Sequence, residues 1–453
     1  MEFVHKIQAI EDRTVMLFVI IALALVMLIS VSDFIRKCNV RKDLIKARKS
    51  KAKGIIFGKE KSAYVYSPTS QEGHVAVFGG SGLGKTSAIL IPTLRSWSGT
   101  SFTIDISGDI CKNVEMPNKA IYEPSNVDSV PYNIFGLIDL MDDEADKNEA
   151  LEQLAIHLMP DSENMSDTTR FFQTEGRKIL TASLIAFYHT GEDFIAICER
   201  ITQNSWKSLF QAIDETGYTK AIQFINSFEG ASEQNTAGCK QACDMAVKLF
   251  STNLKIKRNV RRPRENEECI MPSSAEKSNV FVVVEDSKLK LYAPLLHILT
   301  VQCLEHFSQR NGQNLHTILL CLDEFASLGH MEITDALRKL RKKKVRIMVL
   351  TQSLADIDLV YGCEERKAMM NNFKFKVVLG ASDTDTQEYF AKLIGYQKMK
   401  KHSVSTNSRQ TTRTESEAKE WAIEPAELDR LGNELVVLYP GGYMIIQKNY
   451  YYK

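Results

Sequence analysis

The sequence predicts an α/β fold built on a parallel sheet, with a helical domain inserted into it and one apolar helix ahead of it. An apolar run at His74–Phe78 ends at a glycine-rich loop and is followed by a helical pattern. Further apolar runs alternate with helices on both sides of a long stretch that has only helical periodicity. Alternating strands and helices around such a loop indicate a parallel sheet covered by helices.

The composition is that of an ordinary globular protein and excludes few functions. The 453 residues are enough for two or three domains. Lys and Arg total 57 against 56 for Asp and Glu, so a nucleic-acid surface would have to be a local patch. Nine cysteines are scattered without zinc-finger spacing, which favours reduced thiols over a metal site or a disulfide framework.

The first element in the chain is an uncharged apolar segment, Thr14–Ser32. As a helix of 19 residues it would measure about 28 Å, close to the thickness of a bilayer core. A signal peptide places its positive charges before the apolar region, whereas here the basic cluster follows it, between Arg36 and Lys53. We therefore expect a single-pass anchor in the cell membrane, with the N-terminus outside and the bulk of the chain in the cytoplasm.

The glycine-rich loop has the spacing G-x-x-x-x-G-K-[ST] of a phosphate-binding loop. Glycines allow backbone N–H groups to surround phosphate oxygens, and the following helix directs its N-terminal amides at the same anion. Lys85 can reach the β- and γ-phosphates of ATP, and Thr86 can ligate Mg²⁺. The residues expected to contact the nucleotide are Gly79, Gly80, Ser81, Gly82, Leu83, Gly84, Lys85, Thr86 and Ser87.

The remaining elements follow from periodicity. Pro92 predicts a kink or an early end of the helix after the loop. Residues 143–253 show only helical patterns, and 255–264 contains six basic residues that are either a phosphate-contacting patch or a solvated loop. The polar stretch Lys401–Lys419 predicts a mobile loop. We expect strands at Ser101–Ile106, Asn279–Glu285, Thr317–Leu322, Arg346–Thr351 and Phe375–Leu379, and a closing hairpin at Glu434–Tyr439 and Tyr443–Gln447.

The strand at Thr317–Leu322 runs directly into Asp323 and Glu324. An apolar strand that ends in two acids is typical of a Walker B motif, which delivers a carboxylate to the Mg²⁺ shell beside the phosphate loop. We expect Asp323 to hold Mg²⁺ and Glu324 to polarise the attacking water. Alone the pattern is weak, and the phosphate loop earlier in the chain strengthens it.

A very basic helix at Ile333–Val345 precedes the next strand. Fast hydrolysis by such ATPases requires a positive group against the γ-phosphate, often an arginine from a neighbouring subunit. Arg338 and Arg341 are the candidates, although a basic helix is more often a solvated face. Gln352 follows the strand Arg346–Thr351, where a polar side chain can detect the γ-phosphate or simply cap the strand.

These motifs together resemble the type IV coupling proteins of conjugative DNA transfer, which are relatives of FtsK and HerA. The similarity lies in the phosphate loop with Pro92 behind it, in the sequence Asp-Glu-Phe-x-x-Leu-Gly from Asp323, and in the strand that ends at Gln352. Residues 104–112 resemble the family's Asp-x-Lys-Gly-Glu stretch, but Ser107 replaces the usual lysine and Asp109 the usual glutamate.

The resemblance implies a membrane-anchored hexameric ATPase whose RecA-like domains surround a channel. Such a protein receives a relaxase bound to single-stranded DNA and passes it to a type IV secretion channel at the inner membrane. The resemblance aligns Arg341 with the arginine finger that acts in trans and Gln352 with the sensor. Many members have two membrane segments around a small external domain, whereas this sequence shows one. Some members also have a long C-terminal tail, which this sequence does not show.

The expected domains are a short external N-terminus (1–14), the transmembrane helix (15–35), a basic juxtamembrane segment (36–53), a RecA-like nucleotide-binding domain in two parts (54–142 and 273–453) and an all-α insertion (143–272). Two other functions stay open. The chain could be a pump for double-stranded DNA, or a secretion receptor that uses nucleotide only as a switch; Glu324 argues against the second.

Overall fold

The computed structural model describes residues 43–160, 166–312, 315–407 and 410–452, and for 399–418 only the backbone path. A 12-stranded sheet forms the centre, in the order β1–β3–β2–β14–β13–β10–β4–β9–β8–β5–β7–β6. The strands are β1 (Ile45–Ala47), β2 (Gly54–Glu60), β3 (Ala63–Pro68), β4 (His74–Phe78), β5 (Thr100–Ile106), β6 (Lys119–Tyr122), β7 (Asn279–Val284), β8 (Ile318–Leu322), β9 (Val345–Thr351), β10 (Phe373–Val378), β13 (Glu434–Tyr439) and β14 (Gly442–Gln447).

The part of the sheet from β10 to β6 is parallel, which confirms the expected arrangement around the phosphate loop. Strands β13, β14, β2, β3 and β1 extend it with antiparallel pairs, so the sheet as a whole is mixed. The closing hairpin predicted from the sequence is β13–β14. Strand β6 was not predicted, because it has only four residues, Lys119–Tyr122, which are too few to show an alternation of apolar and polar side chains.

Both faces of the parallel part are buried. Along β4, Val75 and Val77 belong to one hydrophobic cluster, and Ala76 and Phe78 to another. Successive side chains of a strand point to opposite faces, so the two clusters lie on the two sides of the sheet. The helices that pack around it are α2 (Ile91–Ser96), α3 (Asp109–Asn113), α11 (Leu289–Gln309), α12 (Ile333–Lys339), α13 (Leu354–Asn372) and α14 (Thr384–Ile394).

The helix after the phosphate loop is interrupted where Pro92 predicted it. A π-helical segment, η2 (Lys85–Leu90), passes into α2, and Pro92 lies in the first turn of α2. Proline lacks an N–H group and clashes with the carbonyl four residues earlier, so a regular α-helix cannot run through this point from η2. The helix ends at Ser96.

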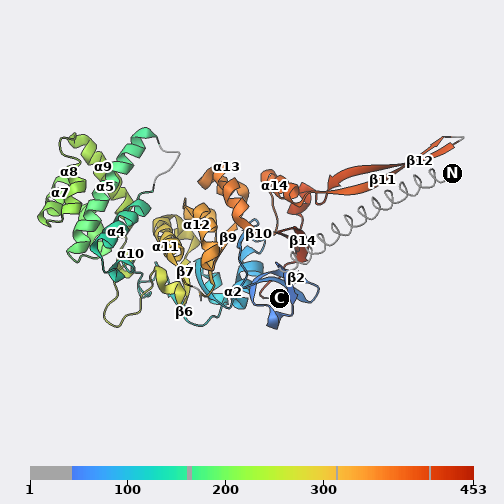
Figure 1. Cartoon of the computed structure of the whole chain (residues 1–453), viewed down its shortest axis with the longest axis horizontal. Coiled ribbons are helices and arrows are strands. Elements are labelled where there is room, and N and C mark those ends of the chain that lie inside the picture. Colours follow the sequence, from blue (N-terminus) through green and yellow to red (C-terminus); the bar gives the residue numbers. More distant parts are fainter. Residues whose placement is uncertain (1–42, 161–165, 313–314, 408–409, 453) are drawn as a thin grey trace, which may run out of the picture.

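The helical stretch forms a separate lobe at one end of the molecule, drawn in green in Figure 1. Its helices lie between β6 and β7 in the sequence, as an insertion requires. They are α4 (Glu144–Leu158), α5 (Asp167–His189), α6 (Phe194–Gln203), α7 (Trp206–Glu215), α8 (Thr219–Asn226), α9 (Glu233–Thr252) and α10 (Leu254–Asn259).

The basic stretch 255–264 lies at the C-terminal end of this lobe, and two of its arginines form ion pairs within the chain. Arg262 donates two hydrogen bonds to Asp139, and its guanidinium lies over the rings of Phe135 and Tyr188. Arg261 makes a bidentate pair with Glu267. These contacts favour a structural role for the two arginines, while contact of the segment with DNA stays a prediction.

The expectation of a mobile loop at Lys401–Lys419 is wrong. The chain there forms a two-stranded ribbon, β11 (Tyr396–Asn407) and β12 (Gln410–Trp421), which projects from the body in Figure 1. A polar composition excludes a buried strand, but an antiparallel pair satisfies its backbone hydrogen bonds without a core. At the base of the ribbon the rings of Tyr396 and Trp421 stack at 4.3 Å.

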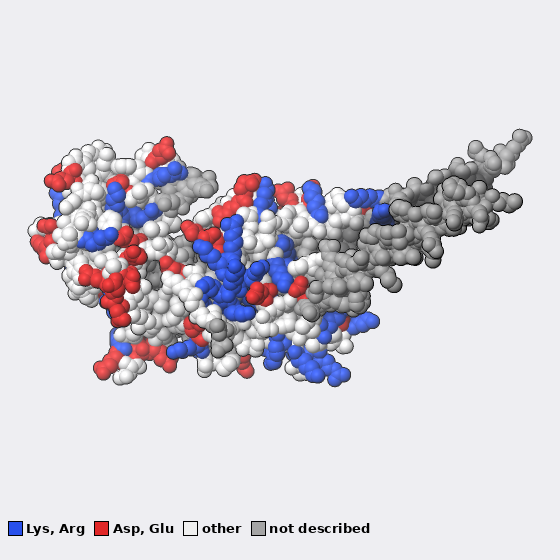
Figure 2. Space-filling model, viewed as in Figure 1, with Lys and Arg blue, Asp and Glu red and all other residues white. Residues whose placement is uncertain are grey.

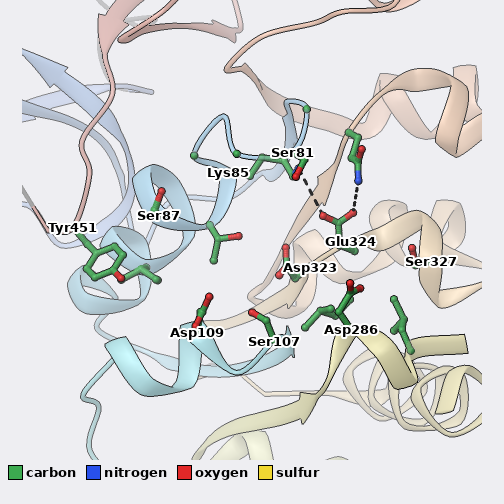
Figure 3. Close-up of a pocket in the computed structure, with 18 residues that line it drawn as sticks. Ser81, Lys85, Ser87, Ser107, Asp109, Asp286, Asp323, Glu324, Ser327 and Tyr451 are labelled. Carbon is green, nitrogen blue, oxygen red and sulfur yellow. Dashed lines mark hydrogen bonds and ion pairs between the residues drawn. The ribbon is translucent and has the colours of Figure 1, made fainter. Parts of the chain in front are cut away.

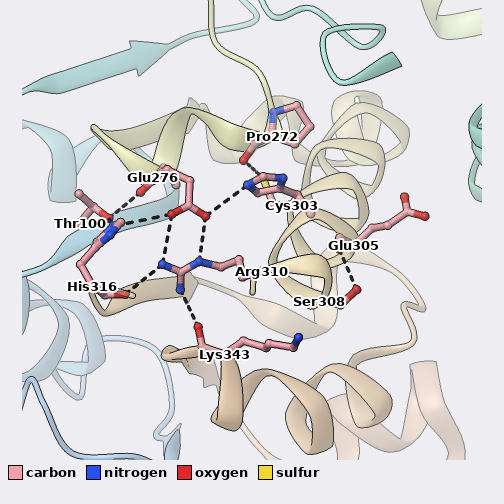
Figure 4. Close-up of polar contacts among 11 residues, drawn as sticks. Thr100, Pro272, Glu276, Cys303, Glu305, Ser308, Arg310, His316 and Lys343 are labelled. Carbon is pink, nitrogen blue, oxygen red and sulfur yellow. Dashed lines mark hydrogen bonds and ion pairs between the residues drawn. The ribbon is translucent and has the colours of Figure 1, made fainter. Parts of the chain in front are cut away.

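The basic helix predicted before β9 is α12 followed by a 3₁₀ turn, η7 (Leu340–Lys343). Figure 2 shows Lys and Arg side chains gathered across the middle of the molecule, where this segment lies. A buried arginine fixes the end of η7 (Figure 4): Arg310 donates to the Lys343 carbonyl at 2.6 Å and to Glu276 at 3.1 Å. Only 2% of the Arg310 side chain is exposed, so the η7 backbone is held from inside the domain.

The predicted transmembrane helix lies outside the described residues. Within residues 43–160, 166–312, 315–407 and 410–452, no helix has the length and hydropathy needed to cross a membrane.

We expect Arg310→Met to lower the free energy of unfolding by about 2–4 kcal/mol, because Glu276 would keep a partly buried charge without its partner. The ion pair of Lys207 with Glu233 is the control, since both side chains are more than half exposed. Lys207→Met should change stability by less than about 0.5 kcal/mol. Urea unfolding of the two variants measures the difference, and equal midpoints would contradict the structural role of Arg310.

Candidate nucleotide-binding site

The phosphate loop connects the carboxyl end of β4 to η2. Gly82 and Gly84 have φ angles of +76° and +98°. This left-handed conformation favours glycine, since a Cβ atom would strain the backbone. The amide of Gly79 is fixed to the neighbouring strand, where it donates to the Thr351 carbonyl at 3.2 Å. The local sequence therefore folds into an open cradle of backbone amides at the start of a helix.

A cavity of about 500 Å³ opens in front of this loop. It brings together most of the residues predicted from the sequence, although they come from three separate parts of the chain. Those that line it are Gly80, Ser81, Gly82, Gly84, Lys85, Thr86, Ser87, Asp323, Glu324 and Gln352. Gly79 and Leu83 do not line it: the Gly79 carbonyl is turned to Lys85, and Leu83 packs against the hydrophobic core.

Lys85 is the cation at the centre of the site (Figure 3). Its ammonium group donates to the Gly79 carbonyl at 2.7 Å and lies 3.7 Å from a carboxylate oxygen of Glu324. The side chain is only 6% exposed. A buried ammonium group requires compensating partners, and a phosphate chain in the loop would supply stronger ones than a single carbonyl and a distant carboxylate.

Asp323 ends β8 beside a second buried carboxylate, Asp105 at the end of β5. One oxygen of Asp323, Oδ1, is buried without a hydrogen-bond partner. Burial, together with the charges of Glu324 and Asp105, raises the pKa of Asp323 to about 7. The backbone amides of Ile110 and Cys111 satisfy Asp105, whose pKa is nevertheless raised by burial.

The unpartnered oxygen of Asp323 fits a divalent cation. Thr86 lines the same cavity and offers a hydroxyl. Within the described residues no cluster of three His, Cys, Asp or Glu side chains could hold a metal alone. Mg²⁺ usually keeps water ligands and is bound through one or two protein groups plus substrate phosphates. The donor set therefore fits a metal that arrives with a nucleotide.

Glu324 lies on one side of the phosphate loop, and the helical segment η2, which carries Ser87, lies on the other (Figure 3). Its backbone is left-handed, with φ 46° and ψ 50°, which is uncommon for a residue with a Cβ atom. One carboxylate oxygen faces Lys85, and the Gln352 amide donates to the other at 3.5 Å. Gln352 comes from the end of β9, so the two strand ends hold the Glu324 carboxylate between Lys85 and an amide.

The two candidate arginines do not reach this cavity. Both precede β9, whereas the cavity lies at its carboxyl end, and a strand of seven residues separates the two edges by about 20 Å. Arg341 lies 3.7 Å from Glu72 and its side chain is 58% exposed. Arg338 lies 3.7 Å from Asp335 and is 57% exposed. Neither arginine completes the site of its own chain.

Several residues of the cavity were not predicted as site residues. Ser107 and Asp109 lie in the stretch 104–112. They directly follow the predicted strand that contains Asp105, and this position at a strand end was the one sequence feature that could have indicated them. Asp286 and Ser327 also line the cavity. Tyr451 joins it from the far end of the chain, and nothing in the local sequence around it indicates a site.

The profile of a family described as "Type IV secretory system Conjugative DNA transfer" matches residues 29–453. The chain belongs to this family. Among curated proteins, it is 26% identical to protein VirD4 of Rhizobium radiobacter over 377 residues, covering 79% of this chain and 54% of that protein. A probable conjugal transfer protein TraG of Sinorhizobium fredii is 24% identical over 401 residues, covering 82% of the chain and 60% of that protein. The chain thus spans about half the length of the curated relatives it matches.

Solved structures of a conjugative coupling protein, TrwB, share the fold. The unbound form has a TM-score of 0.67 at 19% identity and covers 83% of this chain and 84% of that one. A complex of TrwB with the ATP analogue ADPNP has a TM-score of 0.69 at 19% identity, with 90% and 91% covered. At this identity the likeness establishes the fold, a TrwB-like RecA-type α/β fold with a mixed sheet.

We expect Asp323→Asn to stabilise the metal-free protein at pH 8 and to do so by roughly half as much at pH 5.5. A carboxylate whose folded pKa is raised stays protonated in the folded chain up to about pH 7, so folding loses stability as pH rises from the unfolded pKa through that value. Asparagine carries no charge and removes this loss. Thermal unfolding in a chelator, at both pH values, measures the effect.

Asp335→Asn is the control, because its exposed carboxylate is paired with Lys339, which lowers its pKa, and it stays ionised throughout this range. A stabilisation by Asp323→Asn that does not change with pH would contradict the buried, unpaired state of this carboxyl group.

Proposed function

We propose that this protein is an ATPase that couples hydrolysis to the export of relaxase-bound single-stranded DNA, or of protein substrates, through a type IV secretion channel during conjugation. The family and the fold support the process. The observation that carries the enzymatic part is Glu324, held in one cavity between Lys85 and Gln352, with the unpaired oxygen of Asp323 beside it.

Binding begins with the loop. The backbone amides from Gly80 to Thr86 surround the phosphates, and Lys85 exchanges the Gly79 carbonyl for β- and γ-phosphate oxygens. Thr86 and Asp323 would hold Mg²⁺, and the ion would supply positive charge against the phosphate oxygens. The site therefore offers a buried cation, Lys85, to the phosphates and an unpartnered carboxylate oxygen, on Asp323, to the metal.

Hydrolysis depends on Glu324. Once Lys85 turns toward the phosphates, the Glu324 carboxylate is free to accept a proton from a water that attacks the γ-phosphorus, opposite the bridging oxygen that leaves with ADP. Gln352 orients that carboxylate and lies where it can contact the γ-phosphate. A protein that used nucleotide only as a switch would need the loop and Asp323 but not this acid, which favours the ATPase over the switched receptor.

The missing positive group is proposed to come from a neighbouring copy. Arg341 is exposed at the edge of the sheet opposite its own cavity, and its guanidinium lies 3.7 Å from Glu72. A head-to-tail arrangement would bring this edge against the cavity of the next copy, and head-to-tail interfaces close into a ring when the rotation from one copy to the next closes. We propose a hexamer in which Arg341 of one subunit completes the site of its neighbour.

The membrane anchor belongs to the same proposal. The apolar segment 15–35 and the basic residues that follow it support a single-pass protein in the cell membrane, with its ATPase domain in the cytoplasm. This position would place the motor beside the secretion channel. The described chain begins at Asp43, whose carboxylate lies 2.7 Å from the ammonium group of Lys374 in β10.

We expect Glu324→Gln to bind ATP normally and to hydrolyse it roughly 10²–10⁴ times more slowly, because the amide cannot accept the proton of water. Lys85→Ala is the matched comparison and should lose binding as well. The measurement is ATP hydrolysis with and without single-stranded DNA, beside nucleotide binding at equilibrium. Equal hydrolysis by Glu324→Gln and the unaltered protein would contradict the role of this acid, and stronger stimulation by duplex DNA would favour a duplex pump.

A mixing experiment tests the arginine in trans. Lys85→Ala and Arg341→Ala should each be inactive alone, with a loss of about 10³-fold or more for the arginine. Mixed in equal amounts, they should regain hydrolysis, since about a quarter of the interfaces in a ring would pair an intact Lys85 with an intact Arg341.

Arg338→Ala is the control and should stay active on its own. If Arg338→Ala were instead the inactive variant, and regained hydrolysis when mixed with Lys85→Ala, the finger would be Arg338. If neither arginine variant regained hydrolysis in the mixture, catalysis across an interface would be contradicted.

A further inference from the structure

The cavity has a second end, away from Glu324. There it is lined by Ser87, in the helical segment after the phosphate loop, and by Tyr451 (Figure 3). Glu324 and Ser81 lie at the other end in the same view, and Gln352 donates to Glu324 there. If the γ-phosphate lies beside Glu324, the phosphate chain runs across the loop and the nucleoside lies at the Tyr451 end.

The chain segment that carries Tyr451 is fixed against the loop. The amide of Tyr451 donates to the Ser87 carbonyl at 3.1 Å. The ring of Tyr450 covers Gly84, where a Cβ atom would approach it to 3.0 Å. This contact joins residues more than 360 positions apart, so the end of the described chain forms part of the phosphate-loop wall.

Arg95 holds the Tyr451 ring. Its guanidinium carbon lies 5.0 Å from the ring centroid, and Nη1 donates to the Tyr451 carbonyl at 3.3 Å. The Asn113 carbonyl accepts from Arg95 at 2.9 and 2.6 Å, so the guanidinium itself is anchored. A cation over one part of an aromatic ring fixes the ring's position and leaves its cavity-facing surface available.

We propose that Tyr451, positioned by Arg95, is the wall against which the nucleobase packs. The inference rests on the proposed nucleotide binding and names the part of the substrate that this end recognises. An aromatic ring offers a π-face that every base can use, so recognition by Tyr451 is aromatic contact and not a reading of the base's hydrogen-bonding edge. The substrate class is therefore nucleoside triphosphates with little selection for the base, so ATP and GTP should bind about equally.

The test compares a nucleotide with its phosphates alone. ADP and inorganic pyrophosphate are titrated by calorimetry, with Mg²⁺, into the purified full chain and into Tyr451→Ala and Tyr451→Phe. Tyr451→Ala should weaken ADP binding by roughly 5- to 100-fold, the equivalent of about 1–3 kcal/mol for loss of base–aromatic contact. Pyrophosphate binding should stay within about twofold, and Tyr451→Phe should retain the affinity for ADP.

Tyr396→Ala is the matched control, because it also truncates a solvent-accessible tyrosine, but one at the base of the ribbon. It should leave ADP binding unchanged. Equal weakening of ADP and pyrophosphate by Tyr451→Ala would overturn the proposal, since it would mean that the segment only supports the loop. Unchanged ADP binding, or a preference for ADP over GDP of more than about tenfold in the unaltered chain, would overturn it as well.

These outcomes are separate from failure of the proposed function. If the unaltered chain bound neither ADP nor pyrophosphate, nucleotide binding itself would be absent. If it bound ADP through Tyr451 but never hydrolysed ATP, the contact of the base with Tyr451 would hold and the proposed ATPase activity would be wrong.

Discussion

The site depends on two buried aspartates and a partly exposed glutamate, whose negative charges a single buried cation only partly balances. Asp105 lies at the end of β5 and Asp323 follows the neighbouring strand β8, and Glu324 comes next in the chain, so three acids gather at one edge of the sheet. Burial prevents water from screening Asp323, and together with the charges of Glu324 and Asp105 it raises the pKa of Asp323 to about 7. An arrangement that is electrostatically unfavourable when empty is suited to bind a metal with a polyphosphate, because binding supplies the missing positive charge.

The parallel sheet makes this arrangement possible. The carboxyl ends of β4, β5, β8 and β9 meet at one edge, so residues as far apart in the sequence as Gly80 and Gln352 share one cavity. The same geometry sends Arg341 to the opposite edge, because η7 precedes β9. The loop and the acid therefore lie at one edge and the arginine at the other, which is the separation that the proposed ring requires.

Much of the fold and of the site could be predicted from local patterns. The phosphate loop, the Asp-Glu strand end and Gln352 each have a fixed local geometry, and all of them line the cavity. Patterns failed where the local signal is weak. Strand β6 is short and largely unburied, the β11–β12 ribbon is polar because it needs no core, and the antiparallel extension requires pairing between the two ends of the described chain.

The sequence by itself determined the chemistry that is available: a glycine loop that turns toward phosphates, a lysine, two acids at a strand end and an apolar segment long enough for a membrane. Only the tertiary structure decided how these groups meet. It placed Lys85 3.7 Å from Glu324, left Asp323 Oδ1 unpaired, kept Arg341 out of its own cavity and brought Tyr451 to the phosphate loop. Local geometry follows from residue type and spacing, but a contact between distant segments depends on which strands and helices pack together, and no local pattern encodes that.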